Sequence, residues 1–333
     1  MHPLPPLPVV DLHCDLLCYL SRHAERTPFD PAARCAIPQL HAGKVQLQIL
    51  AIFTETTPCS VEEGLHQAHL YQQLSLRHPH HFRSYEGTWT PPLLSTLLAF
   101  ENASGFCDED EPVQRGCQRL EKVVQTIAKP LYVSLTWNTE NRFGGGAFAP
   151  SIGLKEEGKL LLEELDRLHI AVDLSHASDP LAYDILDYAT QRGLTFPILA
   201  SHSNARVMAA APRNLPDEIA REILRRNGLI GLNLCRHFVG ASPDAFIQHI
   251  VHWMELGGEN QIAFGADFFY DADLSSAQRY GPELFFADYQ DASCYPALLD
   301  LLQRELKWNK KQLSKLAYEN ALTFINNTKI IAL

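Results

Sequence analysis

Short apolar runs rich in Val, Ile and Leu alternate with longer amphipathic stretches along this chain of 333 residues. A short, continuously apolar run predicts a strand buried on both faces, and an amphipathic stretch with helical periodicity predicts a helix. The predicted strands cover 9–13, 45–53, 96–101, 131–137, 171–176, 197–202, 229–234 and 262–267. The predicted helices cover 60–77, 112–128, 156–168, 178–192, 216–227 and 243–256, with 296–307 and 310–327 at the end.

This alternation indicates a parallel sheet, and eight strand–helix units favour a closed (β/α)₈ TIM barrel over an open doubly wound sheet. The helices predicted at 296–307 and 310–327 would pack on the barrel. Before them, residues 269–295 lack clear periodicity, and a long loop in this place usually shapes or covers a site. We find no low-complexity linker or internal repeat, so we predict one domain over residues 1–333.

Composition narrows the classes of function. Hydrophobic residues make up 46% and charged residues 20%, which is typical of a packed globular protein. With 28 Lys and Arg against 39 Asp and Glu, the net charge of −11 argues against a nucleic-acid partner. We find neither an apolar run of the roughly 20 residues that cross a bilayer nor a secretory signal pattern. The eight cysteines include no CxxC pair, so we expect reduced thiols and a cytoplasmic location without membrane partners.

Three histidines and three acids fall at the C-terminal ends of the predicted strands, where such barrels carry their active sites. His13 and Asp15 end the first strand. Because strand side chains alternate, both point to one side and Cys14 points to the other. An imidazole and a carboxylate on one side can chelate a divalent cation. The other strand ends supply Glu101, His176, His202 and Asp267.

Each of these residues has an ordinary structural explanation when taken alone. A single His at a strand end is more often a hydrogen-bonded structural residue, and a single Asp often caps the next helix. Six such groups in one place would be costly to bury without cations. The joint pattern therefore favours a metal centre.

The number of ligands suggests two ions. One catalytic zinc needs about three protein ligands. Five are available in His13, Asp15, Glu101, His176 and His202, which fit two ions that share the Glu101 carboxylate, with Asp267 left for proton transfer. Imidazole and carboxylate ligands suit Zn²⁺, with manganese, cobalt or iron as substitutes. Two such ions can hold one hydroxide and polarise a carbonyl, as hydrolysis requires.

At these residues the sequence resembles the membrane dipeptidase (renal dipeptidase, peptidase M19) family of the amidohydrolase superfamily. The matching stretches occur in the family's order and span most of the predicted barrel. They are 11–15 (DLHCD), 172–178 (VDLSHAS), 201–205 (SHSNA), 212–217 (PRNLPD) and 264–268 (FGADF).

The resemblance implies a zinc-dependent dipeptidase that hydrolyses free dipeptides by a metal-bridged hydroxide. His13 and Asp15 would hold one of two zinc ions, and His176 and His202 the other, with Glu101 between them. Arg213 would pair with the C-terminal carboxylate of the dipeptide, and Asp267 would be the catalytic acid and base. The resemblance also allows a homodimer.

Two positions depart from the family pattern. Trp137, followed by Asn138, stands where the best-known members have a substrate-contacting His, and we expect both residues to bind substrate. Cys235 stands near a position where the family often has an aromatic residue, which predicts a differently shaped pocket. His237 is a reserve candidate for the rim. Two alternatives stay open at this point: the same centre acting on another amide or a lactone, and a non-catalytic ligand-binding homologue.

Overall fold

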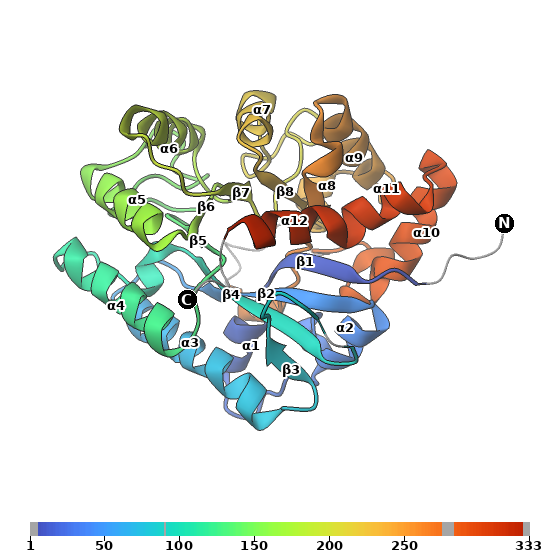
Figure 1. Ribbon diagram of the computed structural model, residues 1–333, viewed down its shortest axis with the longest axis horizontal. Coiled ribbons are helices and arrows are strands. Elements are labelled where there is room, and N and C mark those ends of the chain that lie inside the picture. Colours follow the sequence, from blue (N-terminus) through green and yellow to red (C-terminus); the bar gives the residue numbers. More distant parts are fainter. Residues whose placement is uncertain (1–5, 90, 275–282, 329–333) are drawn as a thin grey trace.

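The computed structural model describes residues 6–89, 91–274 and 283–328, and its strands close into a parallel barrel surrounded by helices (Figure 1). Neighbouring strands are parallel throughout, and β9 pairs with β1 to close the ring. The barrel strands are β1 (Val9–Cys14), β2 (Val45–Phe53), β4 (Leu94–Glu101), β5 (Tyr132–Ser134), β6 (Ala171–Asp173), β7 (Ile198–Ala200), β8 (Leu229–Leu232) and β9 (Ile262–Phe264). The predicted TIM barrel is confirmed.

The main helices lie where the amphipathic pattern predicts them. α6 (Asp179–Arg192), for example, follows Ser178, whose hydroxyl accepts a hydrogen bond from the amide of Leu181, and its C-cap is Gly193 with φ 67°. These are the usual N-cap and C-cap solutions. The helices of the outer ring are α3 (Ser60–Arg77), α4 (Val113–Thr126), α5 (Glu156–Leu168), α6 (Asp179–Arg192), α7 (Asp217–Arg225) and α9 (Ala245–Glu255).

Several elements were not predicted, and all are short. A segment of three to seven residues carries too few periods for a hydrophobic pattern to be recognised. They are α1 (Leu16–Arg22), α2 (Ile37–Ala42), β3 (Phe82–Ser84), which pairs with β4, and α8 (Arg236–Val239). The helix predicted over 310–327 contains a π-helical segment, Lys315–Glu319, between α11 (Lys310–Ser314) and α12 (Asn320–Asn327).

Several strands end earlier than predicted. β6, β7 and β9 stop two or three residues before His176, His202 and Asp267. The reason lies in the backbone, because His176 and Asp267 have φ of 70° and 63°, outside the range of a strand. The chain leaves the sheet there, and the polar side chains are presented from the first residues of the loops.

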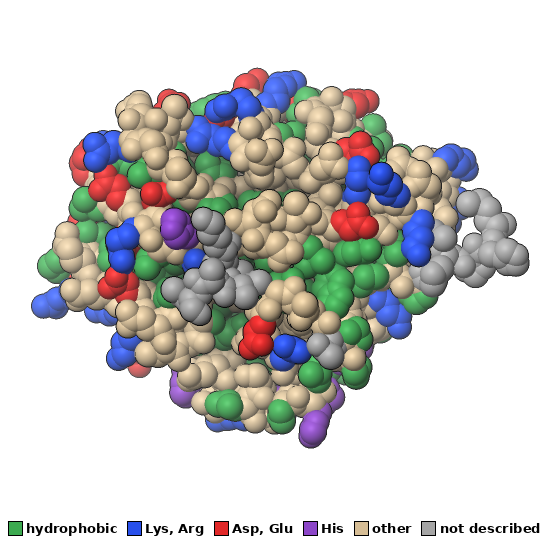
Figure 2. Space-filling model, viewed as in Figure 1, with side chains coloured by type: hydrophobic (Ala, Val, Ile, Leu, Met, Phe, Trp, Pro, Cys, Tyr) green, Lys and Arg blue, Asp and Glu red, His purple; other side chains and the backbone are tan. Residues whose placement is uncertain are grey.

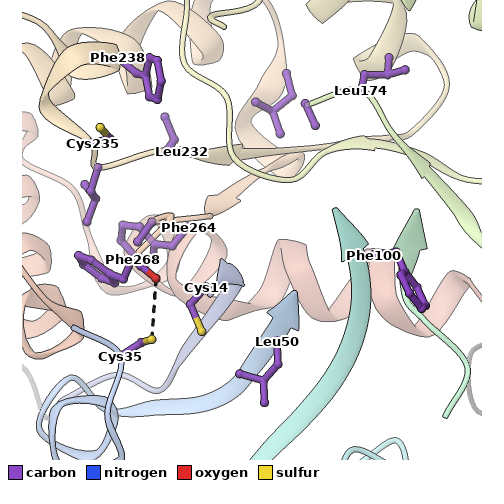
Figure 3. Close-up of a cluster of buried hydrophobic side chains, with 14 of the residues drawn as sticks. Cys14, Cys35, Leu50, Phe100, Leu174, Leu232, Cys235, Phe238, Phe264 and Phe268 are labelled. Carbon is purple, nitrogen blue, oxygen red and sulfur yellow. Dashed lines mark hydrogen bonds between the residues drawn. The ribbon is translucent and has the colours of Figure 1, made fainter. Parts of the chain in front are cut away.

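Two apolar clusters surround the strands. One fills the space between the barrel and its helices and includes Cys14, Phe100 and Phe264, all labelled in Figure 3. Cys14 therefore points away from the barrel axis, as strand alternation predicts. The other cluster lies inside the barrel and includes both Val10 of β1 and Phe324 of α12. α12 crosses the strands in Figure 1.

Residues 269–295 help to shape the cleft, as predicted, although 275–282 lie outside the described residues. Phe269 and Tyr270 line it, and the ring of Phe269 lies 5.7 Å from that of Phe285. α10 (Tyr295–Leu306) follows. Among the described helices, none is long and apolar enough to cross a membrane. Figure 2 shows acidic and basic side chains interspersed over one face.

Candidate metal centre

The six ionisable residues predicted at the strand ends meet at one end of the barrel. Nε2 of His13 lies 3.3 Å from Oε2 of Glu101, 3.7 Å from Oδ1 of Asp267 and 3.9 Å from Oδ1 of Asp15. Nε2 of His202 lies 3.6 Å from Oε1 of Glu101. Ligand atoms of the six residues form three groups of three, each within 4.8 Å, and His13, Glu101 and His202 each belong to two of them.

Glu101 lies between two sets of ligands. Its Oε2 faces His13, and its Oε1 lies 2.5 Å from Nε2 of His176. The side chain is only 4% exposed. A carboxylate whose two oxygens face different ligand groups has the arrangement that a shared ligand of two cations requires.

Asp15 occupies the N-cap position of α1, yet its side chain makes no capping hydrogen bond. The ordinary explanation for an Asp at this place is therefore excluded. Within the part of the chain that the structure describes, Oδ1 of Asp15 and Nε2 of His13 are buried and accept no hydrogen bond. Buried polar atoms without partners are rare, and a cation would satisfy both.

The imidazole rings are held from behind. The hydroxyl of Tyr132 donates to the carbonyl oxygen of Leu12 at 3.0 Å, so it must accept from Nδ1–H of His13, 2.7 Å away. Oδ1 of Asn138, which can only accept, lies 2.8 Å from Nδ1 of His176. In both rings Nδ1 carries the proton, and Nε2 is left to bind a metal. Orientation of this kind is typical of metal-bound histidine.

The electrostatics favour cations. Burial would lower the pKa of His13, but the charges of Glu101, Asp15 and Asp267 outweigh it and raise this pKa to about 10. Burial lowers the pKa of His176 to about 3, and the charge of Arg213 adds to the effect. Without cations, His13 would take up a second proton at Nε2 to balance these carboxylates, and a bound cation would replace that proton.

Burial raises the pKa of Asp267 to about 6 despite the opposing charge of His13. The amide nitrogen of Asn233 donates to its Oδ2 at 2.9 Å. Asp267 thus has one oxygen held by a neutral donor and the other facing His13. The arrangement fixes the direction of the carboxylate without adding a charge.

A cleft opens over these residues. Asp15, Glu101, His176 and Asp267 line it together with six aromatic residues and the charged side chains of Arg22, Glu55 and Asp273. The wall residues include Tyr19, Phe53, Trp137, Phe238, Phe269 and Tyr270.

Comparisons with known proteins agree with this geometry. The family model of the membrane dipeptidases (peptidase family M19) matches residues 4–332. The chain belongs to this family. A curated relative, an uncharacterised protein in the pqqA 5' region of Klebsiella pneumoniae, is 28% identical over 250 residues, which are 71% of this chain and 82% of the relative. An uncharacterised dipeptidase of Schizosaccharomyces pombe is 27% identical over 61% of this chain and 47% of its own length.

Solved structures of similar fold cover nearly the whole chain. A metallopeptidase of Rhodobacter sphaeroides, bound to a phosphinate mimic of the dipeptide L-Ala-D-Ala, has a TM-score of 0.81 at 19% identity, over 97% of this chain and 100% of that chain. A dipeptidase of family M19 has a TM-score of 0.79 at 20% identity, over 97% of this chain and 99% of its own. These likenesses show the fold. Together with the family match, they identify a metallo-dipeptidase, a hydrolase of peptide bonds that uses a divalent metal.

In this dipeptidase, the predicted substrate residues lie in and beside the cleft. Trp137 lies in its wall, with its ring 5.1 Å from that of Phe53 and 6.0 Å from that of His176. Asn138 also lines the cleft, while its Oδ1 is engaged by His176. Arg213 is only 4% exposed and donates from Nη2 to Nε2 of His176 at 3.1 Å.

Cys235 is buried in the outer apolar cluster. The same loop supplies an aromatic residue to the cleft through Phe238, three positions later, whose ring centre lies 5.5 Å from the guanidinium carbon of Arg213. The dipeptidase therefore has an aromatic residue in this wall, although a different position provides it. His237 is exposed on α8 and is not among the residues that line the cleft.

The residues that orient the proposed metal ligands were not predicted from the sequence. Tyr132 and Asn233 are ordinary members of buried strand and loop segments, and no spacing marks them. Asp173 and Ser201 could have been found, because a charged or hydroxyl residue inside an apolar strand needs partners. Both belong to the stretches that carry the family resemblance.

Proposed function

We propose that this dipeptidase hydrolyses the peptide bond of free dipeptides with two Zn²⁺ ions bound at the six-residue centre. His13 and Asp15 would hold one ion, His176 and His202 the other, and Glu101 would contact both. The observation that carries the proposal is the position of Glu101, which directs one carboxylate oxygen to His13 and the other to His176. Bound there, the ions would activate a water molecule and polarise the peptide carbonyl.

The chain's own residues would carry out the remaining steps. Asp267, held by Asn233, is placed to accept a proton from the attacking water and to return it to the leaving amine. Arg213 lies against His176 and would pair with the substrate carboxylate, since a planar guanidinium can bind a carboxylate by two parallel hydrogen bonds. Trp137 would pack on the substrate. The aromatic walls would keep water from the reacting bond.

The cleft by itself does not distinguish a dipeptide from another amide or a lactone. Arg213 favours the dipeptide, because its guanidinium can bind the free carboxylate that a dipeptide carries and a simple lactone lacks. A non-catalytic role would give no reason for Asp267, which lies beside the proposed ligands and is held by a separate donor. The homodimer and the cytoplasmic location stay predictions from the sequence.

The deciding experiment pairs a metal count with a substrate screen. Purified protein would be analysed for bound metals, reloaded with Zn²⁺, and assayed on L,L- and L,D-dipeptides beside N-acyl amino acids and lactones. We expect about two zinc ions per chain and preferential release of free amino acids from dipeptides. A zinc-loaded protein that cleaves lactones and no dipeptide would contradict the substrate, and a stable count of one ion would contradict the shared role of Glu101.

A further inference from the structure

Asp173 is a buried carboxylate at the end of β6 that accepts four hydrogen bonds. Its Oδ1 accepts from the amides of Ser175 at 3.1 Å and Ser201 at 2.8 Å. Its Oδ2 lies 2.8 Å from the hydroxyl of Ser134 and 2.7 Å from that of Ser201. Burial raises the pKa of Asp173, and these hydrogen bonds oppose that effect. A carboxylate with four donors around it has every lone pair used, as the ionised form requires.

The hydroxyl of Ser201 links this carboxylate to a proposed metal ligand. Its oxygen lies 2.7 Å from Nδ1 of His202. A hydroxyl has one proton. If Ser201 donates that proton to Asp173, it must accept the next hydrogen bond from Nδ1–H of His202. Nε2 of His202 is then left with its lone pair, 2.8 Å from Nε2 of His176 and 3.6 Å from Oε1 of Glu101.

This arrangement differs from those behind the other two histidines. The hydroxyl of Tyr132, which contacts His13, donates a hydrogen bond to the carbonyl oxygen of Leu12. The ring of His176 is bonded to the side-chain amide of Asn138. Both partners are neutral. The hydrogen bonds behind His202 run instead through the hydroxyl of Ser201 to the carboxylate of Asp173, which makes the direction of the protons depend on a charge.

We propose that Asp173 is a positioning residue that acts through Ser201 to hold His202 in the Nδ1–H form, and so sets the affinity for the ion that His176 and His202 would share. The part of the proposal that concerns ion affinity rests on the proposed metal centre, and the part that concerns the protonated nitrogen of His202 does not. The protonated nitrogen of His202 can be observed in the protein without metal, independently of activity.

The direct test is Asp173→Asn, which keeps the size of the side chain and removes its charge. The new amide nitrogen would donate to the oxygen of Ser201, so Ser201 would turn its own proton toward Nδ1 of His202. We expect the imidazole to change to the Nε2–H form, which cannot bind a metal through Nε2. Nitrogen-15 NMR of the metal-free protein reports this change directly, with the His202 signal assigned by its loss in His202→Asn.

Zinc binding provides the second measurement. Competition with a chelating dye should show one of the two ions bound about 10- to 100-fold more weakly in Asp173→Asn, the usual effect of losing an outer hydrogen-bond partner. The matched control is Ser134→Ala, which removes another donor to the same carboxylate oxygen but has no contact with His202 among the recorded hydrogen bonds. It should keep the Nδ1–H form and bind both ions.

Because Asp173→Asn could fail to fold, Ser201→Ala and Ser201→Thr form a second pair. The alanine variant loses the link and should show a mixture of His202 forms, whereas the threonine variant keeps the hydroxyl and should restore Nδ1–H. Retention of Nδ1–H in Asp173→Asn or in Ser201→Ala would overturn the proposal. A shift of the His202 proton in a protein that cleaves no dipeptide would uphold it and contradict the proposed function instead.

Discussion

Tyr132 holds the imidazole of His13 in place through a hydrogen bond of 2.7 Å between its hydroxyl and Nδ1. The two residues are 119 positions apart in the sequence, and both are completely buried. The phenol fixes both the rotation of the ring and the nitrogen that bears the proton. It therefore prepares Nε2 for a cation before any cation binds.

We predict that Tyr132→Phe weakens binding of the ion held by His13 and Asp15 by about 10- to 100-fold, because the ring loses its orienting partner. Metal retained after dialysis against graded chelator would measure the effect. The control is Tyr71→Phe, which removes another buried phenol hydroxyl, bonded to Thr96 on the outer side of the sheet. Equal metal loss in both variants would contradict a specific role for Tyr132.

Asp267→Asn should abolish most activity and leave the metals bound. The amide has nearly the shape of the carboxylate but cannot accept the proton from water, and general-base catalysis typically contributes about 10²- to 10⁴-fold. The measurement is kcat on the best dipeptide together with metal content by atomic absorption. A variant that has lost its metals as well as its activity would instead place Asp267 among the ligands.

Removal of the metals should destabilise the protein as well as inactivate it. Without cations, Asp15, Glu101 and Asp267 repel one another in a buried site, and ligands that bind only the folded state stabilise it. We expect the metal-free protein to unfold at a lower temperature, and added Zn²⁺ to restore both Tm and activity. Added Ca²⁺ serves as the control, since imidazole ligands suit it poorly. Full activity after complete removal would contradict a metal-dependent reaction.

Trp137→Ala should raise KM more than it lowers kcat. The indole packs against Phe53 and His176 in the cleft wall, and one aromatic contact contributes about 0.5–1.5 kcal/mol beyond its buried area. We expect KM to rise about tenfold on that scale. Steady-state kinetics would be compared with Trp89→Ala, whose indole packs on Tyr318 away from the cleft. A fall in kcat alone would assign Trp137 to the chemical step.

Glu222→Gln should lower stability at neutral pH and have less effect in acid. The hydrogen bond from Arg225, with that from Arg226, lowers the pKa of Glu222 from 4.5 to about 2. A lowered pKa stabilises the folded state above the unfolded pKa, and this contribution is lost as pH falls from 4.5 toward 2. Because the pair is partly exposed, we expect only about 0.5–1 kcal/mol.

Urea unfolding of the wild type and Glu222→Gln over that pH range would measure the difference. Glu218→Gln, which changes an exposed carboxylate on the same helix, is the matched control. A difference between wild type and Glu222→Gln that stays constant as the solution is acidified would contradict the assigned ion pair.

The order of the helices and strands could be predicted because the hydrophobic pattern of each depends only on residues close together in the sequence. Each barrel strand is a run of apolar residues long enough to recognise, and α3 and α5 begin and end at the predicted residues. α1 and α8 were not predicted because a helix of one or two turns is too short to show a hydrophobic period. The interruption of the helix after Lys310 was not predicted because a π-helical segment changes the backbone hydrogen bonding without changing the apolar pattern.

The proposed ligands themselves could be named from the sequence, since parallel strands bring their C-terminal ends to one rim whatever their lengths. Their orientation could not. Which oxygen of Glu101 faces His13, and that the oxygen of Asn138 is used by His176, depend on strand register and on side-chain angles that no spacing encodes.

By itself, the sequence determined the barrel and the set of polar residues at its rim, because periodicity and strand direction are properties of neighbouring residues. Only the tertiary structure decided that Tyr132, Asn138 and Ser201 support the three imidazoles and that Phe238 lies in the cleft. Those contacts join residues from different strands and loops. Their formation depends on the closed barrel, where packing of the two apolar clusters sets each strand's height and rotation.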